Sequence, residues 1–460
     1  MACAPLTVVI GAGISGLACA YALQKKGQDV LVVEAASRPG GVIQSVEKDA
    51  YLLEQGPQSF SGTPLLYEFC AELGLNEQIV EAPHGAPRFV LLGGKLVPVP
   101  MSPPAFLSSD LLGWKTKFAI LTEVLRTSRP PEPDESIAAF TRRKFSAELL
   151  DRLVGPFVSG IYAGDPEQIS LRAAFPGIYE AETSSGSVVR GMFRAAKKSQ
   201  VSVSQAQLSR RPSLLSFRSG NETLPNALAD KLGSKLRRNI EVSDIRRTEN
   251  GFLVRSQKLE ASGEISCQRL VVATPTKVTA SLLGQLVPRA VPSLREIAYA
   301  PVAVVSLGYR REQVRHSLHG FGFLAPRSSL IRTLGTVWNS SLFPSRAPQG
   351  QVLLTSFVGG ATDPAAADLS DDALSALVHA ELAPLLDISG QPVMQHVNLY
   401  TRAIPQFNLG HTERLETIRE AAKQAPGLWL TGNYWRGPAV GSCIEHALKV
   451  AEQVRISYKS

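Results

Sequence analysis

Residues 6–34 carry a pattern that commits the N-terminal part of the chain to one supersecondary unit. A buried-strand pattern at 6–10 runs into the turn Gly11-Ala12-Gly13-Ile14-Ser15-Gly16, and an apolar helical stretch follows through Leu23. A second strand pattern at 29–33 ends at Glu34, eighteen residues after Gly16. Strand, glycines, helix, strand and acid coincide in the required order, so the pattern predicts a βαβ unit that binds a dinucleotide.

Each part of this unit has a physical task. Gly11 permits the tight turn, Gly13 lets the backbone approach a pyrophosphate, and Gly16 lets helix and strand pack closely. The N–H groups at the start of the helix then face the anion, and the Glu34 carboxylate accepts hydrogen bonds from ribose hydroxyls. The contacts expected from this unit are Gly11, Ala12, Gly13, Ile14, Ser15, Gly16, Glu34 and Ala35.

A second pair of glycines favours FAD over NAD. Residues 38–42 read Arg-Pro-Gly-Gly-Val, and Gly40-Gly41 allows another close backbone approach that a nicotinamide dehydrogenase does not need. This continuation resembles the flavin amine oxidase superfamily, although Val42 replaces the usual arginine, which points away from the amine oxidases themselves. The resemblance extends the expected FAD contacts to Gly41, Val42, Gly56, Pro57, Gln58 and Ser59.

The C-terminal region supports the same ligand. Residues 427–433 read as a strand and a turn, and 437–441 open a helix that runs through Ala451. They resemble the superfamily's C-terminal flavin motif, in which amides at a helix N-terminus face the flavin. The patterns at 240–242 and 270–275 resemble the returning strands of the same domain, with Val242 expected against adenine. The expected contacts here are Val242, Asn433, Pro438, Ala439 and Val440, and Asn433 stands where related flavoproteins often carry Asp.

Further segments resemble one family, the oxygen-dependent porphyrinogen oxidases of haem synthesis. The longest segment, Phe-Val-Ser-Gly-Ile-Tyr-Ala-Gly-Asp-Pro at 157–166, continues to Pro176. Shorter matching segments lie at 56–60, 223–225, 320–326, 357–360, 404–407 and 410–411. Their order and spacing extend the resemblance over essentially the whole chain, with Ser219-Gly220 in place of the family's usual Gly-Gly as a departure.

The resemblance implies a FAD-dependent enzyme that oxidises a porphyrinogen. Six electrons leave protoporphyrinogen IX in three rounds to give protoporphyrin IX, and dioxygen reoxidises the flavin and yields hydrogen peroxide. Coproporphyrinogen III is the alternative substrate. More distant alternatives are a flavin amine oxidase, whose aromatic cage Tyr434-Trp435 could imitate, a carotenoid desaturase, and a non-catalytic FAD-binding porphyrin carrier.

The substrate requires apolar walls and a cation at one rim, because a porphyrinogen is an apolar macrocycle that carries carboxylates. By resemblance, Arg88 binds a carboxylate, and Leu324, Val337 and Phe357 sandwich the pyrrole rings. From the pattern alone, the three apolar residues read as strand core and Arg88 as a member of a surface ion pair. No pair or triad of residues is marked as a general acid or base.

The net charge and the cysteines limit the kinds of partner, metal site and compartment that we expect for this protein. The net charge of +8 suits an anionic membrane face or a negatively charged small substrate, whereas the dispersed Lys and Arg disfavour nucleic acid. The five cysteines, Cys3, Cys19, Cys70, Cys267 and Cys443, form no close pair, which argues against a zinc site and a disulfide framework and favours a reducing compartment. His316 and His319 read as surface histidines, and no metal is expected.

The expected architecture is α/β, with a discontinuous Rossmann-like FAD domain, an α+β substrate domain and a small helical domain. The FAD domain is expected at 1–77, 216–276 and 403–460. The substrate domain takes 78–88, 191–215 and 277–402, with strands at 301–307 and 352–357. The helical domain takes 89–190, and it is the part expected to associate with a membrane.

Two features bear on membrane contact. The apolar stretch 6–23 is broken by three glycines and follows no basic segment, so it is neither a transmembrane helix nor a signal peptide. Residues 110–121, with Asp110 as the expected cap, mix Trp, Leu and Phe with lysines and read either as a membrane-surface helix or as a core helix. We expect a cytoplasmic protein, peripheral on the cytoplasmic membrane, with a homodimer and a ferrochelatase-type pathway partner left open.

Overall fold

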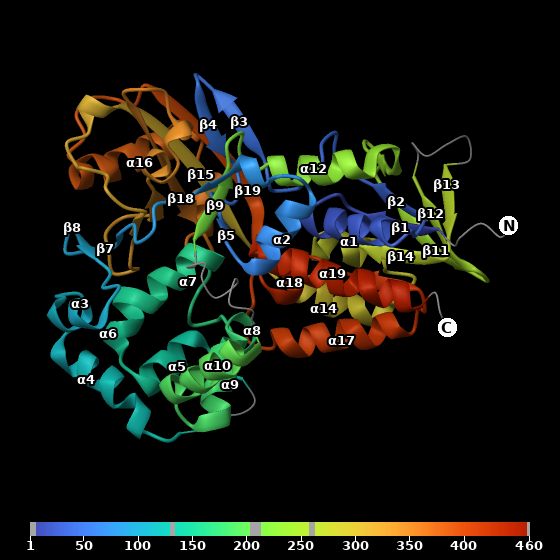
Figure 1. Ribbon diagram of the computed structural model, residues 1–460, viewed down its shortest axis with the longest axis horizontal. Coiled ribbons are helices and arrows are strands. Elements are labelled where there is room, and N and C mark those ends of the chain that lie inside the picture. Colours follow the sequence, from blue (N-terminus) through green and yellow to red (C-terminus); the bar gives the residue numbers. More distant parts are fainter. Residues whose placement is uncertain (1–5, 129–133, 203–212, 257–262, 458–460) are drawn as a thin grey trace.

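The structure, a computed structural model, describes residues 6–128, 134–202, 213–256 and 263–457, and the side chains of 196 and 198–202 are not described. Figure 1 shows three groups of elements: a parallel sheet with its helices near both ends of the described chain, a second sheet beside it, and a cluster of helices below the second sheet.

A five-stranded parallel sheet forms the first group, in the order β10-β2-β1-β14-β20. Its strands are β1 (Thr7–Ile10), β2 (Val30–Val33), β10 (Leu236–Arg237), β14 (Arg269–Val272) and β20 (Leu428–Leu430). The central strands carry short runs of β-branched and apolar residues that are buried on both faces, as a parallel sheet covered on both sides requires. Strands from the two ends and the middle of the sequence are therefore neighbours in one sheet.

Helices cover both faces of this sheet. One face carries α1 (Ile14–Lys25), α2 (Pro64–Glu72), α12 (Thr223–Leu232) and α19 (Val440–Ile456). The other carries α13 (Thr276–Leu282), α14 (Val291–Glu296), α17 (His411–Lys423) and a small sheet of β11 (Asp244–Thr248), β12 (Gly251–Arg255) and β13 (Glu264–Cys267). The apolar faces of these elements bury the sheet, and this is the α/β arrangement that the N-terminal pattern predicts.

One strand expectation is wrong. Residues 240–242 are not a strand; the strand that pairs with β2 is β10, which ends at Arg237. Asn239 has a left-handed backbone, with φ of 59°, and turns the chain away from the sheet. Two backbone hydrogen bonds keep the segment beside the end of β2: the Asn239 N–H donates to the Ala36 carbonyl at 3.1 Å, and the Ile240 N–H donates to the Glu34 carbonyl at 2.8 Å.

The second sheet has seven strands in the order β19-β15-β18-β17-β16-β7-β8. Its strands are β7 (Arg88–Leu92), β8 (Lys95–Pro98), β15 (Tyr299–Arg310), β16 (Gly322–Leu324), β17 (Thr333–Val337), β18 (Gln351–Gly359) and β19 (Met394–Pro405). All pairs are antiparallel except β16 with β7. Helix α16 (Asp371–Leu386) buries one face of this sheet, and the other face is turned toward the FAD-binding unit and the helical cluster.

Smaller elements join the two sheets. They are the hairpin of β3 (Ser45–Lys48) and β4 (Tyr51–Glu54), and the three strands β5 (Phe60–Ser61), β6 (Ile79–Glu81) and β9 (Leu214–Phe217). Tyr51 of β4 lies against Gly308 of β15, where an added Cβ would come within 2.5 Å of the tyrosine ring. The hairpin therefore reaches the mixed sheet directly.

The helical cluster begins later and ends later than expected. Residues 88–98 form the hairpin β7–β8 around Gly93 and Gly94, which both have positive φ, so assigning 89–98 to a helical segment is wrong. The helices are α3 (Pro103–Ser108), α4 (Trp114–Thr122), α5 (Ile137–Lys144), α6 (Ala147–Leu149), α7 (Gly155–Tyr162), α8 (Leu171–Ala174), α9 (Pro176–Ser185) and α10 (Val188–Ser202). Helix α10 packs on α9, which extends the cluster past residue 190; the division into three domains stays a prediction.

Helix α4 does not begin at Asp110. It begins at Trp114, with Gly113 as its cap residue, and the Gly113 N–H donates to both oxygens of Glu148 at 3.2 and 3.1 Å. Leu111 and Leu112 are buried under β7 before the helix starts, so burying these two leucines moves the helix start past the expected cap.

A buried ion cluster holds the helices together. The Lys144 ammonium lies 3.3 Å from Glu123 and 3.0 Å from Glu182, and all three side chains are 3% exposed or less. Burial opposes ionisation of Glu123, but hydrogen bonds from Ser187, from the Val188 N–H and from neighbouring groups outweigh it and lower the Glu123 pKa. The cluster thereby ties the start of α10 to α5.

Some features are absent from the described part of the chain. None of its helices is long and apolar enough to span a membrane. No group of three His, Cys, Asp or Glu side chains is placed to hold a metal within the same residues. Cys19, Cys70, Cys267 and Cys443 are buried free thiols, and Cys3 lies outside the described residues.

Candidate functional site

The three glycines of the first turn have three different environments. Gly11 has φ of 100°, and a Cβ at Gly16 would lie 1.9 Å from the Gly11 carbonyl oxygen, so both positions need glycine for the fold itself. A Cβ at Gly13 would meet no protein atom within 4 Å. The turn therefore leaves open space at Gly13, in front of the N-terminus of α1, where the sequence pattern places a pyrophosphate.

Glu34 lies at the end of β2 and closes this turn. One of its carboxylate oxygens accepts from the Ala12 N–H at 2.6 Å, and the other accepts from the Ala36 N–H at 2.8 Å. Ala35 beside it is exposed. The carboxylate is thus held at the edge of the turn with an open neighbour, as the recognition of a ribose requires.

Two further loops converge on Gly13. The Gly40 N–H donates to the Ala12 carbonyl at 2.8 Å, and a Cβ at Gly41 would lie 3.4 Å from the Gly13 Cα. Val42 is 44% exposed, and behind it a Cβ at Gly56 would lie 2.1 Å from the Val42 carbonyl oxygen. The turn at 11–16, the loop at 40–42 and the loop at 56–59 therefore form one continuous backbone cradle.

The C-terminal motif brings a second helix N-terminus to the cradle. The short helix α18 (Asn433–Arg436) lies between Gly432 and Gly437, both with positive φ, and α19 begins at Val440 after Ala439. No side chain caps α19, so its first N–H groups are available to an electron-rich ligand edge.

A buried cysteine shows that α1 and α19 begin side by side. Burial raises the pKa of Cys443, on α19, to about 11, while a hydrogen bond from Ser15, on α1, opposes the rise. The two helix N-termini therefore point into the same region. Two uncapped N-termini, open space at Gly13 and an anchored Glu34 fit the phosphates, ribose and flavin of FAD.

Val242 is half-buried in the segment that follows Ile240. The Ile240 N–H donates to the Glu34 carbonyl, so Val242 lies two residues from a contact with Glu34 although it is not part of a strand. Its contact with adenine stays a prediction.

The four predicted substrate residues share one face of the seven-stranded sheet. Arg88 pairs with Gly322, Leu324 pairs with Gly335, and Gly335 pairs in turn with Phe357. Because alternate residues of a strand point to the same face, Arg88, Leu324, Val337 and Phe357 all lie on the face opposite α16. The sheet register thus brings together residues that are separated by up to 269 positions in the sequence.

Helix α7 lies against this face, and it carries the longest family-like segment. A Cβ at Gly160 would come within 2.8 Å of a Leu324 methyl group, so glycine lets the helix approach the sheet closely. Phe157 and Ile161, four residues apart on the same side of this helix, are 48% and 36% exposed although they are apolar. The sequence reasoning did not single these two out; their spacing of four inside the family-like segment is the signal that could have found them.

Arg88 stands at the start of β7 and at the rim of this face. Its guanidinium lies 5.6 Å from the centre of the Phe321 ring. Among the described residues, no carboxylate lies within ion-pair distance of it, so the surface ion pair considered for Arg88 is not formed there. An exposed guanidinium beside apolar walls is available to a carboxylate.

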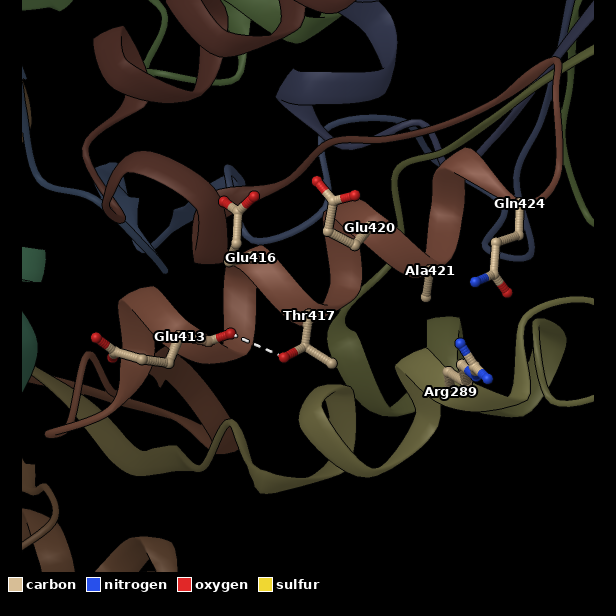
Figure 2. A pocket seen from close by; sticks show the side chains of 7 residues that line it. All are labelled: Arg289, Glu413, Glu416, Thr417, Glu420, Ala421 and Gln424. Carbon is tan, nitrogen blue, oxygen red and sulfur yellow. Dashed lines mark hydrogen bonds between the residues drawn. The ribbon is translucent and has the colours of Figure 1, made fainter.

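A surface hollow lies elsewhere, between α17 and η5 (Pro288–Ala290) (Figure 2). Figure 2 shows Glu416 and Glu420 pointing away from Arg289, so the charged groups do not converge on a ligand. None of the residues predicted to bind FAD or substrate lines this hollow. The cradle and the sheet face therefore remain the candidate site.

Comparison with known proteins agrees with this geometry. A family model described as flavin containing amine oxidoreductase matches residues 14–455. The structure is similar to a putative protoporphyrinogen oxidase from Exiguobacterium sp. 255-15, with a TM-score of 0.81 at 24% identity and 99% coverage of both chains. It is also similar to UDP-galactopyranose mutase, with a TM-score of 0.73 at 16% identity over 98% of this chain and 96% of that one. Fold and cradle define a FAD-dependent oxidoreductase of the flavin amine oxidase superfamily.

Curated relatives define the family more narrowly. The chain is 36% identical to the chloroplastic protoporphyrinogen oxidase of Nicotiana tabacum, over 98% of this chain and 86% of the relative. It is 30% identical to the coproporphyrinogen III oxidase of Bacillus subtilis (strain 168), over 98% of both chains. The chain therefore belongs to the protoporphyrinogen/coproporphyrinogen oxidase family. The predictions of family and cofactor are confirmed.

Proposed function

We propose that this protein oxidises protoporphyrinogen IX to protoporphyrin IX in three two-electron rounds, each of which reduces one dioxygen to hydrogen peroxide. FAD, when bound, accepts the hydride and passes the electrons to dioxygen. The observation that carries the proposal is the sheet face on which the half-buried Leu324 and Phe357 provide apolar surface and Arg88 provides the cation. Val337 lies on the same face but is only 8% exposed, because it packs in a small core with Leu342 and Phe343. The residues of this chain bind and orient the macrocycle.

The balance of charge on this face supports the substrate with two propionates. Within β7, β16, β17 and β18, Arg88 is the only basic residue. The neighbouring strand β8 carries one more cation on this face, Lys95, but it pairs with Leu92 at the far end of β7 from Arg88. The two additional propionates of coproporphyrinogen III would therefore meet apolar wall next to Arg88, and an unpaired carboxylate is costly to desolvate.

The walls also suit a reaction that repeats at different methylene bridges. Contacts with Leu324, Val337 and Phe357 are non-directional, so the flexible macrocycle can be bound in more than one rotation. Arg88 at the rim fixes which edge of the macrocycle faces out. Close approach of α7 at Gly160 narrows the space above Leu324 and helps to exclude water during hydride transfer.

Turnover of the two porphyrinogens side by side tests the substrate. We expect purified FAD-bound protein in air to produce porphyrin fluorescence, with kcat/KM at least about ten-fold higher for protoporphyrinogen IX, equivalent to one lost carboxylate contact. A higher kcat/KM for coproporphyrinogen III would reverse the assignment. No fluorescence above the rate without enzyme would favour a porphyrin carrier instead.

We also propose that α4 contacts the surface of a membrane. Trp114, Phe118 and Leu121 are 71%, 65% and 56% exposed, and they recur at the spacing of one helix face. Leu125, which follows in η2 (Glu123–Leu125), is 79% exposed. The opposite side, represented by Thr116 at 3%, is buried. An apolar stripe that the fold leaves in water is better suited to a lipid interface than to a core.

Flotation with phosphatidylglycerol vesicles tests the membrane contact. We expect the wild-type protein to float with the vesicles and the double variant Trp114→Ser/Phe118→Ser to stay in solution. Leu330→Ser is the matched control, because Leu330 is fully exposed at 103% but lies in the loop after β16. Equal flotation of the wild type and the double variant would contradict α4 as the contact surface.

A further inference from the structure

The turn that follows β17 connects the substrate face to the flavin side of the molecule. This β17 turn comprises residues 338–346 and contains α15 (Asn339–Leu342) and η7 (Pro344–Arg346). It begins directly after Val337, one of the proposed substrate walls. Two of its buried side chains reach the flavin-side loop, which comprises residues 54–59.

The first link is a hydrogen bond between two buried amides. Asn339 Nδ2 donates to Gln58 Oε1 at 2.7 Å, and the two residues are 2% and 7% exposed. Gln58 Nε2 in turn donates to the Glu54 carbonyl at 2.9 Å and to the Gly56 carbonyl at 3.0 Å. The Gln58 side chain is therefore fixed at both ends, inside its own loop and on the β17 turn.

The second link is a buried ion pair. Arg346 lies 2.8 Å from the Glu54 carboxylate, and their side chains are 0% and 1% exposed. Glu54 also accepts from Ser45 Oγ at 2.7 Å and from the Asn221 N–H at 2.9 Å. A buried ion pair seldom stabilises a fold more than apolar side chains of the same volume would, so its retention is better explained by the geometry it imposes.

We infer that Asn339 is a positioning residue for flavin reduction: through Gln58 it sets the distance between the flavin-side loop and the substrate wall on β17. The Glu54–Arg346 pair holds the base of the same loop. The inference rests on the proposed function and on the proposed contact of Gly56, Pro57, Gln58 and Ser59 with FAD. Hydride transfer is sensitive to such spacing, since a misplacement of about 1 Å can cost about a hundred-fold in rate.

Asn339→Leu is the test variant, because it keeps the branched shape and the number of heavy atoms of the side chain and removes the donor to Gln58. Ser340→Ala is the matched control. Ser340 lies in the same turn and loses a comparable hydrogen bond, since its hydroxyl accepts from the Leu353 N–H at 3.0 Å, but that bond stays within the sheet region. If Asn339→Leu does not fold, Asn339→Ala decides the question, because it removes the donor to Gln58 and leaves the two hydrogen bonds of Gln58 within its own loop in place.

The measurements are FAD content, the absorption spectrum and midpoint potential of the bound flavin, and the anaerobic rate of flavin reduction by protoporphyrinogen IX. We expect Asn339→Leu to retain FAD, to shift the flavin spectrum, and to slow reduction at least about ten-fold while KM changes less than about three-fold. We expect the double variant of Asn339→Leu with Gln58→Met to be no slower than Gln58→Met alone, because Gln58→Met already removes the link to Asn339 together with two bonds within the loop.

Two outcomes would overturn the inference: a reduction rate and flavin spectrum equal to those of the wild type, or an equal loss in Ser340→Ala. If the wild type does not oxidise any porphyrinogen, the proposed function fails by itself. The comparison of flavin spectrum and midpoint potential between Asn339→Leu, Ser340→Ala and the wild type, made by chemical reduction, then still decides whether Asn339 positions the flavin-side loop.

Discussion

Gly13 and Gly16 lie three residues apart in one turn, yet substitutions at the two positions should have different effects. A larger residue at Gly13 should weaken FAD binding, and one at Gly16 should destabilise the fold. Gly13 has φ of −67°, which any residue adopts, and a Cβ there meets no atom within 4 Å. Gly13→Val should therefore leave the apoprotein within about 0.5 kcal/mol of the wild type, since a lower entropy of the unfolded chain even favours the change. Its side chain would occupy the space of the pyrophosphate, so FAD affinity should fall by a hundred-fold or more, about 3 kcal/mol.

Gly16→Ala should have the opposite profile. Its Cβ would lie 1.9 Å from the Gly11 carbonyl oxygen and 3.2 Å from the Ala273 Cβ, so α1 must move away from β1. Such overpacking costs about 1–3 kcal/mol. Urea unfolding of the two apoproteins measures their free energies of unfolding, and FAD titration of each variant measures its affinity for FAD. Gly13→Val with a wild-type FAD content, or with an apoprotein destabilised as much as Gly16→Ala, would refute the reasoning.

Three further predictions concern charge. Arg88→Ala should raise KM for the porphyrinogen about 10- to 100-fold while FAD stays bound. The control Lys95→Ala, on the neighbouring strand, should leave KM unchanged. An Arg88→Ala protein that contains no flavin would mean that Arg88 has a structural role instead. Lys144→Met leaves the buried Glu123 without its cation, whereas Glu182 keeps Arg143 at 2.9 Å, and the variant should lower the free energy of unfolding in urea by about 3 kcal/mol. An unchanged value would contradict a stabilising role for the Lys144 cation. Burial lowers the pKa of His411 to about 4, so the folded state keeps the ring neutral while the unfolded chain protonates it near pH 6.5. The stabilisation is complete above that pH and should fall by about 3 kcal/mol as the pH drops to 4, measured by urea unfolding, and His411→Leu should flatten this slope.

The FAD cradle was predictable because its determinants are local. Gly11, Gly16 and Glu34 act within one βαβ unit, and the structure gives each the environment that the spacing predicts. The errors arose where longer-range packing decides local structure. Burial of Leu111 and Leu112 under β7 moved the start of α4, and the left-handed Asn239 ended β10 before the segment expected as a strand.

The substrate face was harder to predict from the sequence than the FAD cradle, because it depends on the pairing of distant strands. Arg88, Leu324, Val337 and Phe357 each lie in an alternating strand pattern, and a pattern alone cannot say which of two faces a residue joins. A shift of one residue in the pairing of β16 with β7 would leave Arg88 on the face opposite Leu324. The register that unites them is set by Gly322 and Gly335, since an added Cβ at either would meet neighbouring backbone, at 1.9 Å and 2.7 Å respectively. Glycines on this face therefore bring the strands close together, and the same glycines determine which side chains share the proposed substrate face.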